Sequence, residues 1–369
     1  MRLVSLQADR LRNLRAVSLD LPPGLSLLVG RNGQGKTSLL EAAYLLATGR
    51  SFRTRQLPEL VSWSGGPLRV AGRVATRTGE WRLAVVIDGA ERRLSVDAAD
   101  SSLEEYLGRL DLIALPAEWM RVLREGPEER RRFLDRGIAG MDTSYLRALA
   151  EYRRVLAQRN ALLRGGGSRG TAAAEIDAWD ERLAAAAARV HRRRREYAVR
   201  LAARLGEPGR ALFPGDPDFS LGYRPSPARA GDEGADRFEG VMREALRKTR
   251  GRDTALGFTG EGPHRDDLAL NVDGVDLRKY GSAGQVRSAM IALKLAKLEL
   301  LREERLAPPL FVMDDFDADL DEEKTASLAA FLAVRGVQAL LATSKEAVAS
   351  GLGEPHCRIR VDGGEARVE

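Results

Sequence analysis

A glycine-rich segment near the N-terminus has the residue types and spacing of a phosphate-binding loop. Residues 30–37 read Gly-Arg-Asn-Gly-Gln-Gly-Lys-Thr, an unbroken G-x-x-x-x-G-K-T pattern. The glycines let consecutive backbone N–H groups turn towards phosphate oxygens, Lys36 supplies positive charge, and the Thr37 hydroxyl is suited to ligate Mg²⁺. The segment predicts a nucleoside triphosphate site. The residues predicted to bind the nucleotide here are Gly30, Arg31, Asn32, Gly33, Gln34, Gly35, Lys36, Thr37 and Ser38.

Two adjacent acids after an apolar run supply the second half of such a site. Residues 310–313 are Leu-Phe-Val-Met, and Asp314 and Asp315 follow directly. An apolar strand that ends in an acid places this acid at the C-terminal edge of a sheet, beside a phosphate-binding loop. Asp314 is predicted to hold Mg²⁺ together with Thr37, and Asp315 to orient or deprotonate the attacking water. The predicted catalytic residues are therefore Lys36, Asp314 and Asp315.

A third segment, residues 280–285, reads Tyr-Gly-Ser-Ala-Gly-Gln and precedes a helical pattern from Val286 to about Glu304. A serine at a helix start is a good N-cap, and the start of a helix attracts anions. An S-x-G-Q segment placed before an apolar strand and two acids resembles the signature layout of ABC-type ATPases. That resemblance implies that Ser282, Gly284 and Gln285 contact the γ-phosphate of ATP held by a second subunit, in an ATP-dependent homodimer. The alternative is an ordinary serine N-cap. Thr343, after the last apolar core run, is a further predicted nucleotide contact.

The elements around these segments indicate an α/β fold. Period-two patterns after the first helix, separated by turns at Thr78-Gly79 and Asp88-Gly89, predict an antiparallel meander over the nucleotide core. Buried apolar runs flank the predicted site and complete a mixed sheet. Taken with the resemblance to the ABC-type signature layout, this arrangement implies an ABC-type P-loop ATPase head. The predicted strands are 3–9, 15–21, 25–29, 68–76, 81–88, 92–97, 219–223, 268–272, 310–313 and 337–342.

The middle of the chain has helical periodicity instead. Apolar residues recur every three or four positions from Ser144 to Arg164 and again from Ile176 to Leu201, with a glycine-rich segment at 165–170 between them. This pattern predicts an inserted α-helical lobe with a short helical hairpin, which is either a protruding arm or two ordinary bundle helices. We assign residues 1–110 to the N-terminal half of the head, 111–255 to the inserted lobe and 256–369 to the C-terminal half.

Composition sets limits on the class of protein. The 369 residues carry a net charge of +6, with 59 Lys and Arg, which modestly favours a polyanionic partner. No stretch approaches the length and apolarity of a membrane span, and the N-terminus shows no signal-peptide core. The single cysteine, Cys357, is consistent with a reducing compartment. We expect a cytoplasmic protein with no membrane partner.

Together these motifs resemble the Rad50/SMC branch of ABC ATPases and, in finer detail, the RecF family of recombinational DNA-repair ATPases. The pattern departs from the wider ABC class at two points, because Asp315 stands where glutamate is usual and Ala318 where serine is usual. Neither the transporter-type switch histidine nor a clear Q-loop glutamine is present; Gln56 is the nearest candidate for the latter. The segments that carry the resemblance are 11–14, 49–54, 129–135, 158–163, 262–268, 284–288 and 314–316.

The resemblance implies a weak DNA-stimulated ATPase that acts in DNA replication, recombination, repair and the SOS response, and that is associated with the nucleoid. Its implied partners are double-stranded and gapped DNA, RecR with RecO, and indirectly RecA. An SMC-like DNA organiser is the alternative, although long coiled coils are missing, and a transporter ATPase subunit is a remoter one. Two arginine clusters are candidate DNA contacts, with a solvated helix face as the competing interpretation: Arg130, Arg131, Arg132, Arg192, Arg193, Arg194 and Arg195.

Overall fold

A computed structural model of the chain describes residues 1–63, 65–77, 79–116, 126–165, 171–212, 218–228, 235–317, 320, 322–345 and 357–369. The chain divides into two compact units. Unit 1 comprises Met1–Met120, Arg204–Asp218 and Ser282–Glu369, and unit 2 comprises Arg121–Ala203 and Phe219–Gly281. No helix among the described residues is long and apolar enough to cross a membrane.

The first strands of the chain form an antiparallel sheet in unit 1. Its strand order is β2-β1-β4-β5-β6-β7. Along β4, Leu68, Val70 and Val74 are buried while Arg69 and Arg73 are exposed, as expected of a sheet with one face on the core. The predicted antiparallel meander is confirmed, and it consists of β4, β5 and β6. The strand bounds are β1 (Arg2–Asp9), β2 (Val17–Asp20), β4 (Leu68–Ala75), β5 (Glu80–Asp88), β6 (Glu91–Val96) and β7 (Ala99–Asp100).

A second sheet of unit 1 has the strand order β15-β14-β3-β13-β12-β8. All neighbouring strands are parallel except the final pair, in which β15 is antiparallel to β14. Strands β3, β12 and β13 are buried along their whole length, the pattern of a parallel sheet covered on both faces. The bounds are β3 (Leu25–Val29), β8 (Leu112–Leu115), β12 (Leu310–Met313), β13 (Ala339–Thr343), β14 (Cys357–Asp362) and β15 (Glu365–Val368).

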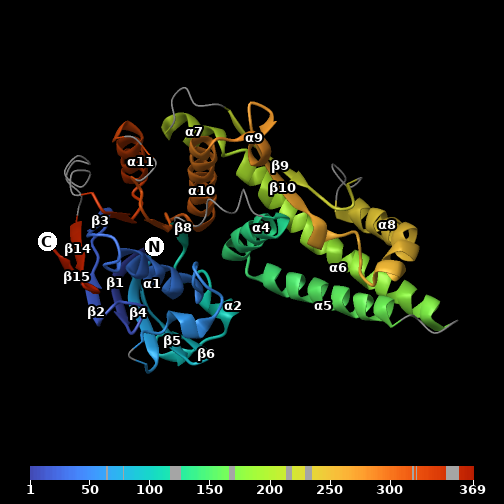
Figure 1. Ribbon diagram of the computed structural model, residues 1–369, viewed down its shortest axis with the longest axis horizontal. Helices are drawn as coiled ribbons and strands as arrows, with labels where there is room; N and C mark the ends of the chain where they lie inside the picture. The colour runs from blue at the N-terminus through green and yellow to red at the C-terminus, as the bar shows by residue number, and fades with distance from the viewer. Residues whose placement is uncertain are drawn as a thin grey trace. The chain divides into compact units, whose positions relative to one another are not determined.

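Helix α1 (Lys36–Thr48) lies between the two sheets and forms the centre of the core of unit 1. It contacts β1, β4 and β5 on one side and β8 and β13 on the other. Eleven of its 13 residues are buried, which explains why its apolar residues are not confined to one stripe. Figure 1 shows α10 (Ala283–Arg305) and α11 (Glu322–Val334) on the opposite face of the second sheet. The short elements of unit 1 are η1 (Leu57–Leu60), α2 (Leu103–Tyr106) and α7 (Gly206–Leu212).

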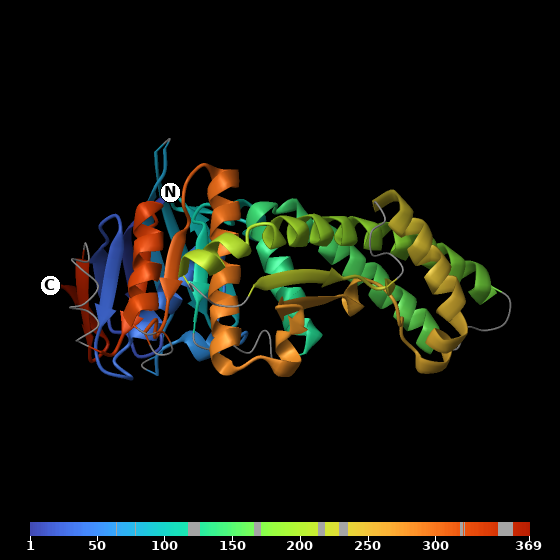
Figure 2. The ribbon, with the colours of Figure 1, turned by 90° about the horizontal axis from the view of Figure 1, so that it is seen from above.

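Unit 2 is mainly helical. Helices α5 (Ser144–Arg164) and α6 (Thr171–Ala202) pack along each other, and α6 also packs against α8 (Ala235–Leu256). In Figure 2 the strand pair β9–β10 runs alongside α6. The predicted helical hairpin therefore has its second helix covered within unit 2. The remaining elements are α4 (Pro127–Met141), β9 (Phe219–Arg224), η4 (Pro263–Arg265), β10 (Asp267–Val272), β11 (Val275–Asp276) and α9 (Leu277–Tyr280).

The predicted α/β class, with a parallel and an antiparallel sheet plus helices, is confirmed. The unit boundaries differ from the division at residues 110 and 255. Strand β8 pairs with β12 and so belongs to unit 1, residues 204–218 also belong to unit 1, and residues 256–281 belong to unit 2. Three predicted features lie wholly or partly outside the described residues: the turn at Thr78, the loop at 166–170, and Ala318 with its neighbours in the segment after Asp317.

Candidate nucleotide-binding site

The glycine-rich loop connects β3 to α1 and is curled by two left-handed residues. Gly33 and Gly35 have φ angles of 81° and 117°, which side chains of L-residues rarely allow. Gly35 is also the N-cap of α1 and offers no capping side chain. The N–H groups of the first helical turn therefore receive no cap from the side chain of the N-cap residue, and an anion can take that place. A Cβ atom at Gly33 would meet nothing within 4 Å, so its requirement for glycine comes from the backbone angle alone.

Lys36 is buried and folds back over this loop. Its Nζ donates to the carbonyl oxygens of Gly30 at 2.7 Å and Arg31 at 3.0 Å. Burial lowers the pKa of Lys36, while the nearby carboxylates of Asp315 and Asp314 act to raise it. The ammonium group thus lies inside the curl of the loop, where a phosphate could replace the two carbonyl oxygens as its partner.

Thr37 and Asp314, which are far apart in the sequence, are hydrogen-bonded in the structure. The Thr37 hydroxyl donates to Asp314 Oδ2 at 2.7 Å. The contact follows from topology, because β3, β13 and β12 are neighbouring parallel strands whose carboxyl ends share one edge. A hydroxyl and a carboxylate are the hard oxygen ligands that Mg²⁺ prefers, with substrate phosphates completing the shell. The residues present therefore fit Mg²⁺.

Asp315 follows in a strained backbone conformation. Its φ angle is 43°, in the left-handed region that costs a non-glycine residue roughly 1–2 kcal/mol. Arg287, a buried residue of α10, donates from Nη2 to the Asp315 carbonyl oxygen at 3.0 Å. Arg287 thereby ties the strained residue to the helix that follows Ser282. The sequence assigned no role to Arg287, although it directly follows the S-x-G-Q segment and Val286.

The S-x-G-Q segment forms the start of α10. Ser282 is the N-cap, its Oγ accepts from the Gln285 N–H at 3.2 Å, and Gln285 Oε1 accepts from the Ser282 N–H at 3.0 Å. Ser282 and Gly284 are both exposed, and a Cβ atom at Gly284 would meet nothing within 4 Å. The predicted serine N-cap is present, and this helix start is open to an incoming group.

Thr343 has a different environment from the one predicted for a nucleotide contact. It is fully buried at the end of β13, and its Oγ1 accepts from the Lys345 N–H at 2.9 Å. The Lys345 ammonium in turn lies 3.3 Å from Asp317 Oδ2. The hydroxyl of Thr343 thus helps to hold the loop that carries Lys345, a residue that sequence reasoning missed.

Arg130 and Arg194 do not lie on a surface that could contact DNA. Arg194 is 3% exposed and pairs with Asp266 at 2.9 Å and with Asp135 at 2.9 Å. Arg130 is 2% exposed and holds Asp267 at 2.6 Å. Both guanidinium groups satisfy carboxylates inside unit 2, so their prediction as DNA contacts is corrected to a structural role. The segments 129–135 and 262–268, which carry part of the resemblance, meet in this network.

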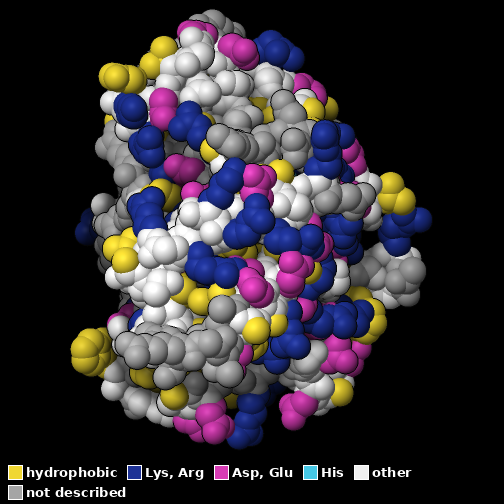
Figure 3. Space-filling model, turned by 90° about the vertical axis from the view of Figure 1, so that its right-hand side faces the viewer, with side chains coloured by type: hydrophobic (Ala, Val, Ile, Leu, Met, Phe, Trp, Pro, Cys, Tyr) yellow, Lys and Arg dark blue, Asp and Glu magenta, His cyan; other side chains and the backbone are white. Residues whose placement is uncertain are grey.

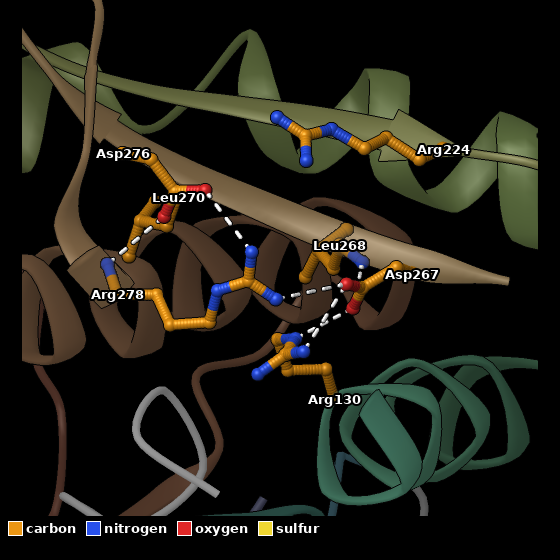
Figure 4. A pocket seen from close by; sticks show the side chains of 7 residues that line it. All are labelled: Arg130, Arg224, Asp267, Leu268, Leu270, Asp276 and Arg278. Carbon is orange, nitrogen blue, oxygen red and sulfur yellow. Dashed lines mark hydrogen bonds and ion pairs between the residues drawn. The ribbon is translucent and has the colours of Figure 1, made fainter. Parts of the chain in front are cut away.

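Figure 4 shows the hollow beside Arg130. Arg130 and Arg278 both approach Asp267, while Arg224 comes from the neighbouring strand β9. The hollow measures about 10 Å³, which is room for about one water molecule. It is too small for a nucleotide or a DNA backbone.

The other arginines of the two clusters vary in their exposure. Arg192 and Arg193 are exposed, and Arg193 pairs with Asp142 at 3.0 Å. Arg132, Arg131 and Arg195 are half-buried; Arg132 pairs with Glu128 and Glu129, and Arg131 donates to the Asp266 carbonyl. On the face drawn in Figure 3, Lys and Arg side chains are mixed with Asp and Glu side chains. The ion pairs of Arg132 and Arg193 with nearby carboxylates are in keeping with the solvated helix face that competes with DNA contact.

Comparisons with known proteins agree with these features. The family model described as RecF/RecN/SMC N terminal domain matches residues 2–360. The DNA replication and repair protein RecF of Myxococcus xanthus (strain DK1622) is 37% identical over 95% of this chain and 93% of that protein. The protein of the same name from Anaeromyxobacter sp. (strain Fw109-5) is 36% identical over 99% of this chain and 98% of that protein.

Solved structures show the same relationship. The recombination mediator protein RecF, solved with ATP and described as part of the RecFOR pathway, aligns with a TM-score of 0.89 at 28% identity, covering 100% of this chain and 97% of that chain. An Smc head domain from Pyrococcus furiosus, bound to the C-terminal domain of ScpA, aligns with a TM-score of 0.56 at 15% identity. The alignment covers 100% of this chain and 95% of that chain, and at this identity it shows a likeness of fold alone. The chain belongs to the RecF family, within the wider group of RecF, RecN and SMC N-terminal domains.

Proposed function

We propose that this chain is an ATP-dependent DNA-binding protein of recombinational repair. ATP joins two copies head to head so that they clamp double-stranded DNA, or the junction of double- and single-stranded DNA at a gap. Slow hydrolysis of ATP then releases the clamp. The observation that carries the proposal is the hydrogen bond between Thr37 and Asp314, because it unites the glycine-rich loop and the acidic strand end in one site.

The proposed nucleotide chemistry divides among four side chains. Lys36 neutralises charge on the β- and γ-phosphates from inside the loop. Thr37 and Asp314 hold Mg²⁺, which when bound offsets the charge of the phosphates. The Asp315 carboxylate orients the attacking water and accepts its proton. Its side chain is one methylene shorter than glutamate, which supports slow hydrolysis. Stimulation of this weak ATPase by DNA is proposed from the family resemblance.

The proposed homodimer rests on the open start of α10. Ser282 and Gly284 lie exposed at a helix start that favours negative charge. The glycine-rich loop of the same chain already surrounds its own phosphates, so the anion for this helix start comes from a second subunit. ATP would therefore be sandwiched between the loop of one copy and the S-x-G-Q segment of the other. We propose unit 1 as this ATPase head and unit 2 as the inserted lobe.

The proposed biological role draws on the relatives. They are named DNA replication and repair proteins, and the solved structures are described as recombination mediators of the RecFOR pathway. We infer that this chain acts in the cytoplasm on nucleoid DNA together with RecR and RecO, and that it helps to load RecA onto single-stranded DNA. The net charge of +6 is in keeping with a polyanionic partner. An SMC-like organiser and a transporter subunit remain less supported alternatives.

ATP binding is tested by replacing the loop lysine. Lys36→Met removes the buried charge and should abolish ATP binding, measured by titration with a fluorescent ATP analogue. Lys248→Met is the matched control, because Lys248 is an exposed lysine of α8 that pairs along its own helix with Glu244. Equal nucleotide affinity in parent and Lys36→Met would remove the loop from the proposed function.

A further inference from the structure

The turn between β14 and β15 lies against the glycine-rich loop. Strand β14 pairs in parallel with β3, with Arg360 opposite Val29. Because β3 continues directly into Gly30, the carboxyl end of β14 must finish beside the start of the loop. The chain then reverses through Gly363 and Gly364, whose φ angles of 54° and 81° suit a two-residue hairpin turn.

Direct hydrogen bonds join this turn to the loop. The Gly364 N–H donates to the Gln34 carbonyl oxygen at 3.1 Å, and the Gly363 N–H donates to Gln34 Oε1 at 2.7 Å. Both the backbone and the side chain of one loop residue are therefore held by the turn. Gln34 stands directly before Gly35, the N-cap of α1, so any movement of Gln34 reorients the N–H groups that face a phosphate.

Asn13 contacts the glycine-rich loop from a third segment of the chain. Its Nδ2 donates to the Gly33 carbonyl oxygen at 2.9 Å, and its Oδ1 accepts from the Ser38 hydroxyl at 2.8 Å. The turn packs on this residue without spare room, since a Cβ atom at Gly364 would lie 2.1 Å from the Asn13 carbonyl oxygen. Similarly, a Cβ atom at Gly30 would lie 2.2 Å from the Val361 carbonyl oxygen. Backbone atoms make both approaches, so no side-chain rotation can relieve them.

We propose that the turn at Gly363-Gly364 is a positioning element of the nucleotide site: it fixes the glycine-rich loop through Gln34 and Asn13, and nucleotide binding tightens it in return. This inference rests on the proposed ATP site and adds a part of the chain that the motifs do not include. The coupling is reciprocal, because an element that favours the binding geometry of the loop is itself stabilised when the loop is occupied.

Gly364→Ala tests the proposal, with Gly363→Ala as its matched control. Both residues have positive φ angles, so both substitutions carry backbone strain. Only the Cβ atom at Gly364 collides with backbone, whereas nothing lies within 4 Å of one at Gly363. Losing one hydrogen bond to the loop weakens binding by up to about tenfold. We expect Gly364→Ala to raise the dissociation constant of ATP about tenfold relative to Gly363→Ala.

Hydrogen exchange of the parent protein keeps the proposal testable if Gly364→Ala folds poorly. The amides of Gly363 and Gly364 should exchange more slowly with saturating ATP than without it, while the exposed Gly89 amide at the β5–β6 turn should not change. Equal ATP affinity of the two variants, or unchanged exchange at both glycines in a parent that binds ATP, would overturn this inference alone. Failure of the parent to bind ATP would instead overturn the proposed function.

Discussion

Removing the buried guanidinium of Arg194 should strongly destabilise unit 2. Arg194→Met keeps similar bulk but removes the cation that Asp266 pairs with at 2.9 Å, and the Asp266 side chain is 0% exposed. Asp135, which is 11% exposed, loses the same partner and keeps only the longer pair with Arg153 at 3.6 Å among the described residues. Breaking a buried pair by removing one partner typically costs about 3–5 kcal/mol. For a unit of this size the melting temperature should fall by roughly 10 °C. Thermal unfolding followed by circular dichroism measures the change.

The pH dependence of this loss identifies its cause. Burial raises the pKa of Asp266, while Arg194 acts to lower it. Without Arg194 the pKa of Asp266 should rise further, so the carboxyl group can fold neutral at low pH. The deficit of Arg194→Met relative to the parent should therefore shrink as pH falls from 8 to 5. Arg192→Met, an exposed neighbour, should change stability by less than about 0.5 kcal/mol. A stable Arg194→Met variant that loses only DNA affinity would refute the structural assignment of Arg194.

Three further results are expected. Asp315→Asn should leave ATP affinity intact but slow hydrolysis, because an amide cannot accept the proton of water; if Asp314→Asn alone produces that trapped state, the two roles are reversed. Ser282→Ala should reduce ATP-dependent dimerisation measured by light scattering. Ser102→Ala, which removes an equivalent capping box from α2, should not reduce it. Equal dimerisation in both variants would contradict the proposal that the S-x-G-Q segment contacts ATP of a second subunit. Burial lowers the pKa of His191 from 6.5 to about 4, so the parent protein should lose stability as pH falls from 6.5 towards 4. His191→Phe should lose less stability over this pH range, as measured by urea titrations. Matching pH profiles of the parent and the variant would contradict the role given to His191.

The sequence predicted the elements whose patterns are long or end at a distinctive motif. The sequence range for α5 matches Ser144–Arg164, and that for β12 matches Leu310–Met313. In α5 the three-to-four spacing persists over several turns, and in β12 an uninterrupted apolar run ends at two acids. Strand β8 is an apolar run of the same length as β12, but no pair of acids follows it, and without such a mark a four-residue apolar run cannot be distinguished from part of a buried helix. Its partner β12 is almost 200 residues away, and only the folded sheet reveals that pairing.

The candidate site was predictable in its motifs but not in its supports. The spacing of the two motifs indicated Lys36, Thr37 and the two acids, because phosphate and Mg²⁺ binding requires particular residue types at these positions. Arg287 donates to the backbone carbonyl oxygen of Asp315. Every residue has such a carbonyl, so the residue type of the partner gives no sign of the contact. The final hairpin did carry a signal, because Asp362-Gly363-Gly364 separates two alternating segments. Its contact with Gln34 depends on the parallel pairing of β14 with β3, and sequence periodicity does not specify strand order.

The arginine clusters show where composition misleads. Arg192, Arg193, Arg194 and Arg195 look equivalent in the sequence, yet Arg194 is the one of the four that is buried. Helical spacing offers the physical reason, because Arg194 lies three positions after the buried His191 and three before the buried Tyr197. A buried guanidinium then requires carboxylates, which Asp135 and Asp266 supply from distant segments. Charge alone predicts a surface, whereas charge combined with helical phase separates the interior residue from its neighbours.

DNA affinity as a function of nucleotide tests the central claim most directly. Fluorescence anisotropy with gapped and duplex DNA should show tighter binding with ATP than with ADP or without nucleotide, and this difference should vanish in Lys36→Met. The affinity with ATP should also fall steeply with salt, with a log–log slope of about −0.9 for each phosphate neutralised. Equal affinity in all three nucleotide states would contradict the ATP-driven clamp.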